Sequence, residues 1–216
     1  MKIAVLIPDR GDRPTLLENC KRMMQAQTLQ PSVVHVVDYA PLSDKCDITQ
    51  RYRIGYDALR NQGFDLIALI ENDDYYSPLY LETMVDAWEA EGRPNIIGTS
   101  YTIYYHLRLK AYFTMYHSTR ASAMNTLIKP DLNFEWCADS EPYTDMHLWK
   151  TIPGIVIKPN KHISIGMKHG TGLCGGHMHN DRLHRYTKYG TQDADHTFLK
   201  ETLDQNSFNF YSQLNT

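Results

Sequence analysis

The chain has 216 residues, the length of one large domain, with 42% hydrophobic and 22% charged residues. These ordinary globular values exclude an intrinsically disordered or collagen-like chain. Apolar runs stay shorter than the roughly 18 residues of a membrane-spanning helix. The apolar run Ile3–Ile7 is too short for the core of a signal peptide, so we expect a cytoplasmic protein without a membrane partner. The four cysteines form no CxxC pair, which argues against a zinc knuckle or a disulfide framework.

The net charge of −3 conceals a segregation of charge along the chain. Residues 92–130 contain five Lys or Arg and no acid, and residues 146–180 also lack acids. Between them, residues 131–145 contain five acids and no base. These blocks predict a surface that receives an anion beside a carboxylate cluster, although solvated faces of uneven charge are the alternative. The balance is not that of a protein with a broad basic face for nucleic acid.

The first half of the chain alternates between patterns typical of strands and of helices. Continuous aliphatic and β-branched runs predict buried strands at 3–7, 33–37 and 66–70, and another from 96 onward. Helices are expected between them at 15–27, 48–61 and 77–91, the first with a capping box from Thr15 to Glu18. This βαβαβαβ order predicts a parallel sheet with helices on both faces.

The pattern changes after residue 98. Antiparallel strands are expected in 99–117 and 120–129, a helix near 143–151, short strands at 155–157 and 163–165, a glycine-rich loop at 166–176, and one helix at 194–204. We expect a single domain over residues 1–216 because no long linker interrupts it. Its expected parts are a first half at 1–98, a second half at 99–180, and a C-terminal tail at 181–216.

Acidic residues follow the predicted strands of the first half. Asp9 and Arg10 follow the first strand, Asp38 follows the second, and the run Glu71–Asp74 follows the third. Ligands bind at the carboxyl ends of strands in open α/β sheets. Mg²⁺ and Mn²⁺ prefer oxygen ligands from one or two carboxylates together with substrate phosphates. The acidic run therefore predicts a site for a hard cation, with a capped turn before the next helix as the alternative.

The order of these features resembles the GT-A-fold glycosyltransferases, in particular those of the family 2 type. The resemblance covers residues 1–98 well and the remainder loosely. Its five features are the strand and proline of Ile3–Pro8, the pair Gln27-Thr28, Asp38, the helix with Arg51 and Ala58, and the acidic run Glu71–Asp74.

Three positions depart from the family pattern. Glu71 stands where an Asp is usual, Asp9 and Arg10 replace small and aromatic residues, and no glycine follows Asp38. These differences concern the identity of the nucleotide more than the fold.

The resemblance implies an α/β fold of the GT-A, Rossmann-like type, with a mostly parallel central sheet and a smaller antiparallel part on the acceptor side. It implies a nucleotide-diphosphate sugar as donor, bound by the half at 1–98, an acceptor-binding and catalytic half at 99–180, and Mn²⁺ or Mg²⁺ as cofactor. The expected metal ligands are Asp73, Glu71 and His169, with His177 and His179 as rivals of His169. The residues expected to bind the nucleotide sugar are Pro8, Asp9, Arg10, Asp38, Arg51, Asn72 and Lys168.

An inverting transfer needs a general base that takes the proton of the acceptor hydroxyl. In the family this is an acidic residue that opens a helix, and Asp145 fits best, with Glu141 and Asp139 as rivals. A helix dipole would keep Asp145 ionised. The alternative is that Asp145 only caps the helix.

Aromatic residues of the second half are candidates for an acceptor platform, because aromatic faces stack on sugar rings and bases. We expect Trp136, Tyr104 and Arg108 to contact the acceptor, although core packing is an alternative for the aromatic residues. We expect the acceptor to be a polymer or a small molecule. The basic residues of this stretch are also compatible with a polyanionic acceptor such as modified DNA.

The sequence therefore favours a metal-dependent, inverting glycosyltransferase that adds one sugar to an acceptor hydroxyl. Two alternatives keep the fold: nucleotidyl transfer onto a sugar phosphate, and a non-catalytic nucleotide-binding module. Nucleotidyl transfer would require a glycine-rich, basic loop after the first strand, whereas Asp9–Arg13 contains one glycine and two acids.

Overall fold

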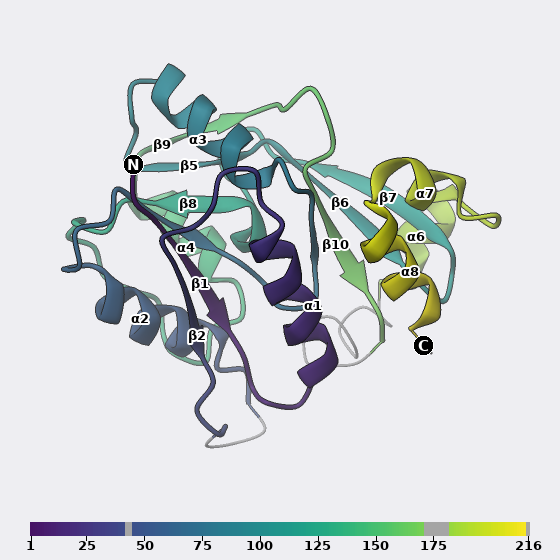
Figure 1. Cartoon of the computed structure of the whole chain (residues 1–216), viewed down its shortest axis with the longest axis horizontal. Helices are drawn as coiled ribbons and strands as arrows, with labels where there is room; N and C mark the ends of the chain where they lie inside the picture. The colour runs from purple at the N-terminus through teal and green to yellow at the C-terminus, as the bar shows by residue number, and fades with distance from the viewer. Residues whose placement is uncertain (42–44, 171–181, 215–216) are drawn as a thin grey trace.

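The computed structural model describes residues 1–41, 45–170 and 182–214, which form two sheets with helices around them (Figure 1). The central sheet has the strand order β2-β1-β3-β8-β5-β9. Its strands are β1 (Ile3–Pro8), β2 (Val33–Val37), β3 (Leu66–Leu69), β5 (Ile96–Thr99), β8 (Thr126–Ile128) and β9 (Gly154–Ile157).

Most neighbours in the central sheet are parallel, as expected. Strand β1 runs parallel to β2 and β3, and β5 runs parallel to β9. Strand β8, however, lies antiparallel between β3 and β5. The first half alone therefore does not form a continuous parallel sheet, because a strand from the second half completes it.

The helices of the first half cover both faces of the central sheet. They are α1 (Pro14–Gln25), α2 (Ile48–Leu59) and α3 (Tyr80–Ala90), and α4 (Thr144–Thr151) joins them from the second half. Alternate residues of β1 point to opposite faces. Ile3, Val5 and Ile7 share a core cluster with buried residues of α1 and α3, and Ala4 and Leu6 share another with residues of α2 and α4.

The second sheet has the order β11-β7-β6-β10-β4. Its strands are β4 (Tyr75–Tyr76), β6 (Tyr101–His106), β7 (Ala111–Tyr116), β10 (Ser164–Lys168) and β11 (Thr191–Gln192). Only β6 and β10 are parallel among the pairs that the described residues form. The acidic run lies between β3 and β4, and therefore at the junction of the two sheets. Residues 166–168 continue β10, so the expected loop at 166–176 begins later, and 171–176 lie outside the described residues.

The C-terminal part contains more helix than the sequence predicts. In place of one helix at 194–204, the structure has α6 (Leu183–Tyr189), α7 (Thr197–Thr202) and α8 (Gln205–Gln213). Asp204 separates the last two because its side chain caps α8, accepting from the backbone N–H groups of Asn206 and Ser207 at 3.1 and 3.0 Å. The short 3₁₀ helix η1 (Ala123–Asn125) precedes β8.

The expected capping box of α1 is not formed. Arg13 is the N-cap residue, and no side chain caps this helix. Pro14 at the first helical position starts the helix early, since its fixed φ angle suits a helix and it has no N–H to satisfy. None of the described helices has the length and apolar character needed to cross a membrane.

Gly55 lets α2 approach β1 closely. A Cβ atom at this position would lie 2.1 Å from Cδ1 of Leu6 and 2.9 Å from Cγ2 of Val37. Leu6 is fully buried and has no space to move away. Arg51 lies one turn before Gly55 on the same helix face, so this close approach also places Arg51 beneath the ends of β1 and β2.

We expect Gly55→Ala to destabilise the protein. Overpacking costs about 1–3 kcal/mol, and the contact of 2.1 Å with the buried Leu6 puts the cost at the upper end of this range. The better helix propensity of alanine returns about 1 kcal/mol, so the net loss should be roughly 2 kcal/mol. Urea denaturation followed by circular dichroism measures the change. Ile54→Ala is the control, because Ile54 is 38% exposed on the same helix. A Gly55→Ala variant as stable as the native protein would contradict this close packing.

Candidate functional site

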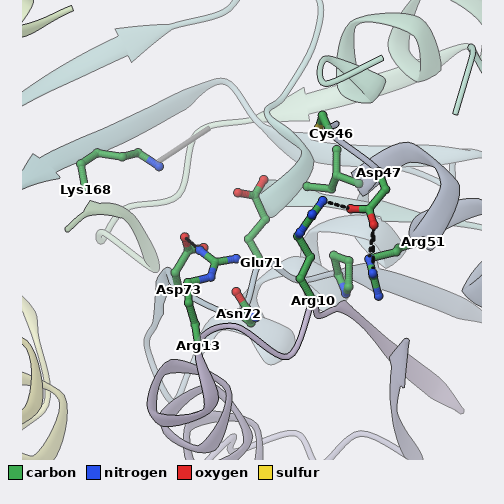
Figure 2. A pocket seen from close by; sticks show the side chains of 11 residues that line it. Arg10, Arg13, Cys46, Asp47, Arg51, Glu71, Asn72, Asp73 and Lys168 are labelled. Carbon is green, nitrogen blue, oxygen red and sulfur yellow. Dashed lines mark hydrogen bonds and ion pairs between the residues drawn. The ribbon is translucent and has the colours of Figure 1, made fainter. Parts of the chain in front are cut away.

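A pocket of about 620 Å³, including space open to solvent, lies at the carboxyl ends of β1 and β3 (Figure 2). We call it the strand-end pocket. It is lined by Pro8, Arg10, Arg13, Cys46, Asp47, Ile48, Arg51, Glu71, Asn72, Asp73 and Lys168. Of the seven residues expected to bind a nucleotide sugar, five line it: Pro8, Arg10, Arg51, Asn72 and Lys168.

Asp9 and Asn72 hold the two strand ends together below this pocket. The amide of Asn72 donates a hydrogen bond to Oδ1 of Asp9, and the N–H of Gly11 donates to Oδ2 at 2.9 Å. Asp9 and Asn72 are 3% and 2% exposed. Asp9 does not line the pocket, and its carboxylate instead fixes the loop after β1 against the acidic run.

Three carboxylates of the acidic run lie close enough to share one cation. Ligand oxygens of Glu71, Asp73 and Asp74 lie within 4.8 Å of one another. The backbone of the run is fixed by two tyrosines. Tyr76 Oη accepts from the N–H of Glu71 at 2.9 Å, and the Tyr211 hydroxyl donates to the carbonyl of Asp73 at 3.2 Å. Asp74 was not among the expected ligands, although it belongs to the same run.

Of the three carboxylates, Asp73 has the negative charge that neighbouring groups balance best. Its Oδ2 lies 2.5 Å from Nη1 of Arg13 and 3.0 Å from Nε2 of His169. Burial raises the pKa of Asp73, but Arg13, the hydrogen bond to His169 and the charge of Lys168 outweigh it and hold the pKa well below its usual range. Asp73 is therefore ionised. His169 lies beside this carboxylate, where it was expected as a metal ligand.

Asp74 and Glu71 are less well compensated. Oδ1 of Asp74 accepts from the N–H of Met167 at 2.8 Å and lies 3.8 Å from Nζ of Lys168, while its buried Oδ2 has no hydrogen-bond partner among the described residues. Burial raises the pKa of Asp74 well above its usual range. Burial also raises the pKa of Glu71 to about 7, with Lys168 opposing the shift.

This donor set fits a divalent cation. The three groups supply hard oxygen ligands of the kind that Mg²⁺ and Mn²⁺ prefer. The buried Oδ2 of Asp74, which has no hydrogen-bond partner among the described residues, leaves a ligand oxygen available for such an ion.

Arg51 donates its hydrogen bonds to acceptors within the protein. Its side chain is 1% exposed, and it donates to the carbonyls of Asp9 and Val37 and to Oδ2 of Asp47. Its guanidinium also lies 4.0 Å from the ring centroid of Tyr39. The structure therefore gives Arg51 a role in joining the ends of β1 and β2 at the floor of the pocket.

Asp38 follows β2 directly, is exposed, and does not line the strand-end pocket. Its expected contact with a nucleotide base therefore has no counterpart in the pocket that the described residues form.

A second cavity adjoins the strand-end pocket and shares Ile48, Glu71 and Lys168 with it. We call it the α4 pocket, because the first turn of α4 lines it. Its remaining lining residues are Asp74, Tyr104, Met115, Arg120, Ser122, Ala123, Met124, Pro142, Tyr143, Thr144, Asp145, Met146, Arg182 and Arg185.

Asp145, the expected general base, lines the α4 pocket. Its Oδ2 lies 2.5 Å from Nη1 of Arg120, and its side chain is 14% exposed. We expected the helix dipole to keep this carboxylate ionised. Hydrogen bonds from backbone N–H groups of α4 do favour the ionised form, as does Arg120, but burial outweighs both and raises the pKa of Asp145 from its usual value.

The rivals of Asp145 face other partners. Asp139 forms a two-point ion pair with Arg53 on α2, with distances of 3.0 and 2.8 Å. Oε1 of Glu141 accepts from the N–H of Tyr143 at 3.0 Å. Neither Asp139 nor Glu141 lines either of the two pockets.

The structure separates the three expected acceptor residues. Tyr104 lines the α4 pocket beneath Lys168, whose Nζ lies 5.1 Å from the ring centroid. Trp136 instead packs against Tyr56 and Phe134, with centroid distances of 5.7 and 5.1 Å. Arg108 is exposed in the turn between β6 and β7.

Trp136 and Arg108 therefore do not line the cavity that the described residues form around Asp145. Arg182 and Arg185 line the α4 pocket but were not among the expected site residues. The only sequence signal for them was the spacing of two arginines in the C-terminal tail. His177 and His179 lie outside the described residues.

The expected fold class is confirmed: this is an α/β fold of the GT-A type, with a mostly parallel central sheet and a smaller second sheet. Among solved structures, the chain is similar to S. aureus TarS 1–349 in complex with UDP-GlcNAc, with a TM-score of 0.51 and 13% identity. That match covers 81% of this chain and 60% of the other. At such identity the similarity concerns the fold alone.

A further structure of TarS 1–349, in complex with UDP, gives a TM-score of 0.49 and 11% identity over 96% of this chain and 77% of that chain. No protein-family model matches this chain, and no curated protein matches it.

We expect Arg51→Met to lower the free energy of unfolding by about 3 kcal/mol or more, because it leaves the carboxylate of Asp47 and two strand-end carbonyls without their buried partner. Arg53→Met is the matched control two residues away. Its ion pair with Asp139 is more than a third exposed on both sides, and such pairs contribute about 1 kcal/mol or less. Guanidinium chloride denaturation measures both variants, and equal losses would contradict a structural role specific to Arg51.

Proposed function

We propose that this protein is a metal-dependent, inverting glycosyltransferase that moves a sugar from a nucleotide-diphosphate sugar to an acceptor hydroxyl. One observation carries the proposal. The carboxylates of the acidic run and the partly buried carboxylate of Asp145 line adjoining pockets that share Glu71 and Lys168. A donor in the strand-end pocket and an acceptor in the α4 pocket would therefore meet beside Lys168.

The solved structure of TarS supports a nucleotide-diphosphate sugar as the donor, since it holds UDP-GlcNAc on a similar fold. In this chain the donor would lie in the strand-end pocket. Arg10 and Arg13 line that pocket together with Lys168 and supply positive charge for a diphosphate. The buried pair of Asp9 and Asn72 fixes the floor of the pocket before any ligand arrives.

Glu71, Asp73 and Asp74 would hold Mn²⁺ or Mg²⁺, with His169 beside Asp73. A bound divalent cation supplies a Lewis acid that neutralises charge on the diphosphate leaving group. Lys168 contributes a fixed charge to the same region, since Asp74, Asp73 and Glu71 outweigh the effect of burial and raise its pKa.

Asp145 would take the proton from the acceptor hydroxyl as the bond to the sugar forms. Its raised pKa makes it a stronger base than an ordinary carboxylate. Arg120 holds the carboxylate in place and favours its ionised form.

We expect the native protein to bind one nucleotide among UDP, GDP, CMP and dTDP in the presence of Mn²⁺. At a ligand concentration of about one hundred times Kd, binding stabilises by about 2.7 kcal/mol, which raises Tm by roughly 5–10 °C for a chain of this size. Asp73→Asn should abolish the Mn²⁺-dependent part of the shift.

Asp86→Asn is the control for this thermal-shift experiment, because Asp86 is an exposed carboxylate on α3. An unchanged metal-dependent shift in Asp73→Asn would contradict the cation site. Release of pyrophosphate from a nucleoside triphosphate would show nucleotidyl transfer in place of sugar transfer.

We expect Asp145→Asn to reduce transfer about 10²- to 10⁴-fold, the usual contribution of a general base, while the affinity for the nucleotide stays unchanged. A general base acts only when deprotonated, so kcat/KM of the native protein should rise with pH through the raised pKa of Asp145 and then level off. Release of the nucleoside diphosphate from the donor sugar measures the rate. Asp139→Asn is the control, and full activity of Asp145→Asn would refute the assignment.

A further inference from the structure

The arginines of the two pockets differ in how their charge is balanced. In the strand-end pocket, Arg10 lies 2.9 Å from a carboxylate oxygen of Asp47 and Arg51 lies 2.9 Å from the other. Arg13 is paired with Asp73. Each arginine of this pocket therefore has an acidic partner within the protein.

The α4 pocket contains two arginines that have no acidic partner among the residues that the structure describes. Arg120 is paired with Asp145, but Arg182 donates to the neutral hydroxyl of Tyr143 at 2.8 Å. Arg185 forms no ion pair with any carboxylate in the ranges that the structure describes. Two half-buried guanidinium groups thus add positive charge to the pocket that contains the expected base.

Helix α6 holds these arginines in place. Arg185 belongs to α6 and Arg182 immediately precedes it, so the spacing of three residues puts both on one side. Tyr186 anchors the helix to the second sheet. It is 2% exposed, and its ring centroid lies 4.9 Å from that of Phe113 and 5.2 Å from that of His106. The position of the arginines is therefore set by packing of α6 on β6 and β7.

Apolar surface lines the same cavity. Tyr143 is 37% exposed and Met146 is 54% exposed, and both line the α4 pocket. A tyrosine face and a thioether suit the ring of a sugar or a base. A guanidinium group suits the paired oxygens of a phosphate, which it binds by two parallel hydrogen bonds.

We propose that the acceptor of the transfer carries a phosphate group, which Arg182 and Arg185 bind in the α4 pocket. That this ligand is the acceptor of a transfer rests on the proposed function. That it carries a phosphate rests on Arg182 and Arg185, whose charge no carboxylate among the described residues balances. The donor diphosphate is the competing ligand for this charge. Arg182 and Arg185, however, do not line the strand-end pocket, whereas Lys168 lines both.

The test compares Arg185→Gln and Arg182→Gln with Lys188→Gln. Lys188 is an exposed cation on the same helix outside the pocket, so its replacement removes an equal charge. The probes are inorganic phosphate, glycerol phosphate and a single-stranded tetranucleotide, each titrated by calorimetry with and without UDP and Mn²⁺. Loss of a charge-assisted hydrogen bond should weaken phosphate binding about tenfold in the two arginine variants and leave it unchanged in Lys188→Gln.

The affinity for the donor nucleotide decides between the two pockets. We expect it to be the same in all three variants, and a parallel loss in the arginine variants would assign these residues to the donor and overturn the proposal. Phosphate binding that is equal in all variants would overturn it as well. Tighter binding of the tetranucleotide than of glycerol phosphate would support a polymeric acceptor, and equal binding would support a small one.

The two proposals fail separately in this experiment. A protein that binds phosphate through Arg185, yet binds no nucleotide with Mn²⁺, would support the anion site and contradict the proposed glycosyltransferase. Metal-dependent nucleotide binding without any phosphate binding would support the donor site of the proposed glycosyltransferase and contradict the anion site.

Discussion

Three carboxylates within 4.8 Å of one another, at a largely buried position, impose the main physical constraint on this molecule. Charge of this density in a low-dielectric setting must be balanced by nearby cations. The chain supplies the cations Arg13, from the segment before α1, and Lys168, from the end of β10, and His169 adds a hydrogen-bond contact with Asp73. The acidic run follows β3 of the first sheet, whereas Lys168 ends β10 of the second sheet. The two sheets must therefore meet here for the carboxylates to be balanced, and not only for the core to pack.

A second set of polar contacts keeps the strand ends rigid beneath the pocket. Asp9 accepts from Asn72 and Gly11, while Arg51 binds the backbone of β1 and β2 and the carboxylate of Asp47. These groups are already satisfied by the protein, so they need no ligand to hold their positions. A preorganised floor of this kind leaves the remaining, incompletely balanced charges of the acidic run and of the α4 pocket available to act on a ligand.

The sequence predicts well what depends on local pattern. The strands β1, β2, β3 and β5, the helices α1 to α4 and the acidic run after β3 all follow from short stretches of residue types. The expected burial of β2 was wrong, because β2 is an edge strand of the central sheet and four of its five residues are only partly buried. The insertion of β8 between β3 and β5 could not be predicted, because its register depends on partners about 30 to 60 residues away. The packing of Trp136 against Phe134 and the position of Arg108 in a hairpin turn could not be predicted. An aromatic ring suits a core as well as a ligand, and a charge does not reveal which end of a hairpin carries it. The place of Arg182 and Arg185 in the α4 pocket could not be predicted either, because it depends on the packing of α6 against β6 and β7.

The hydrogen bond from Tyr211 to the carbonyl of Asp73 links positions 138 residues apart, and both side chains are buried. Closing so long a loop costs chain entropy before the contact gives any stabilisation. The acidic run should therefore reach its final conformation late in folding, after the local β–α units have formed. Opening of α8 in the native protein would likewise loosen the carbonyl of Asp73, so amide hydrogen exchange in α8 and in the acidic run should be correlated. A helix that lines neither pocket would thus set the lifetime of the geometry on which the carboxylate cluster depends.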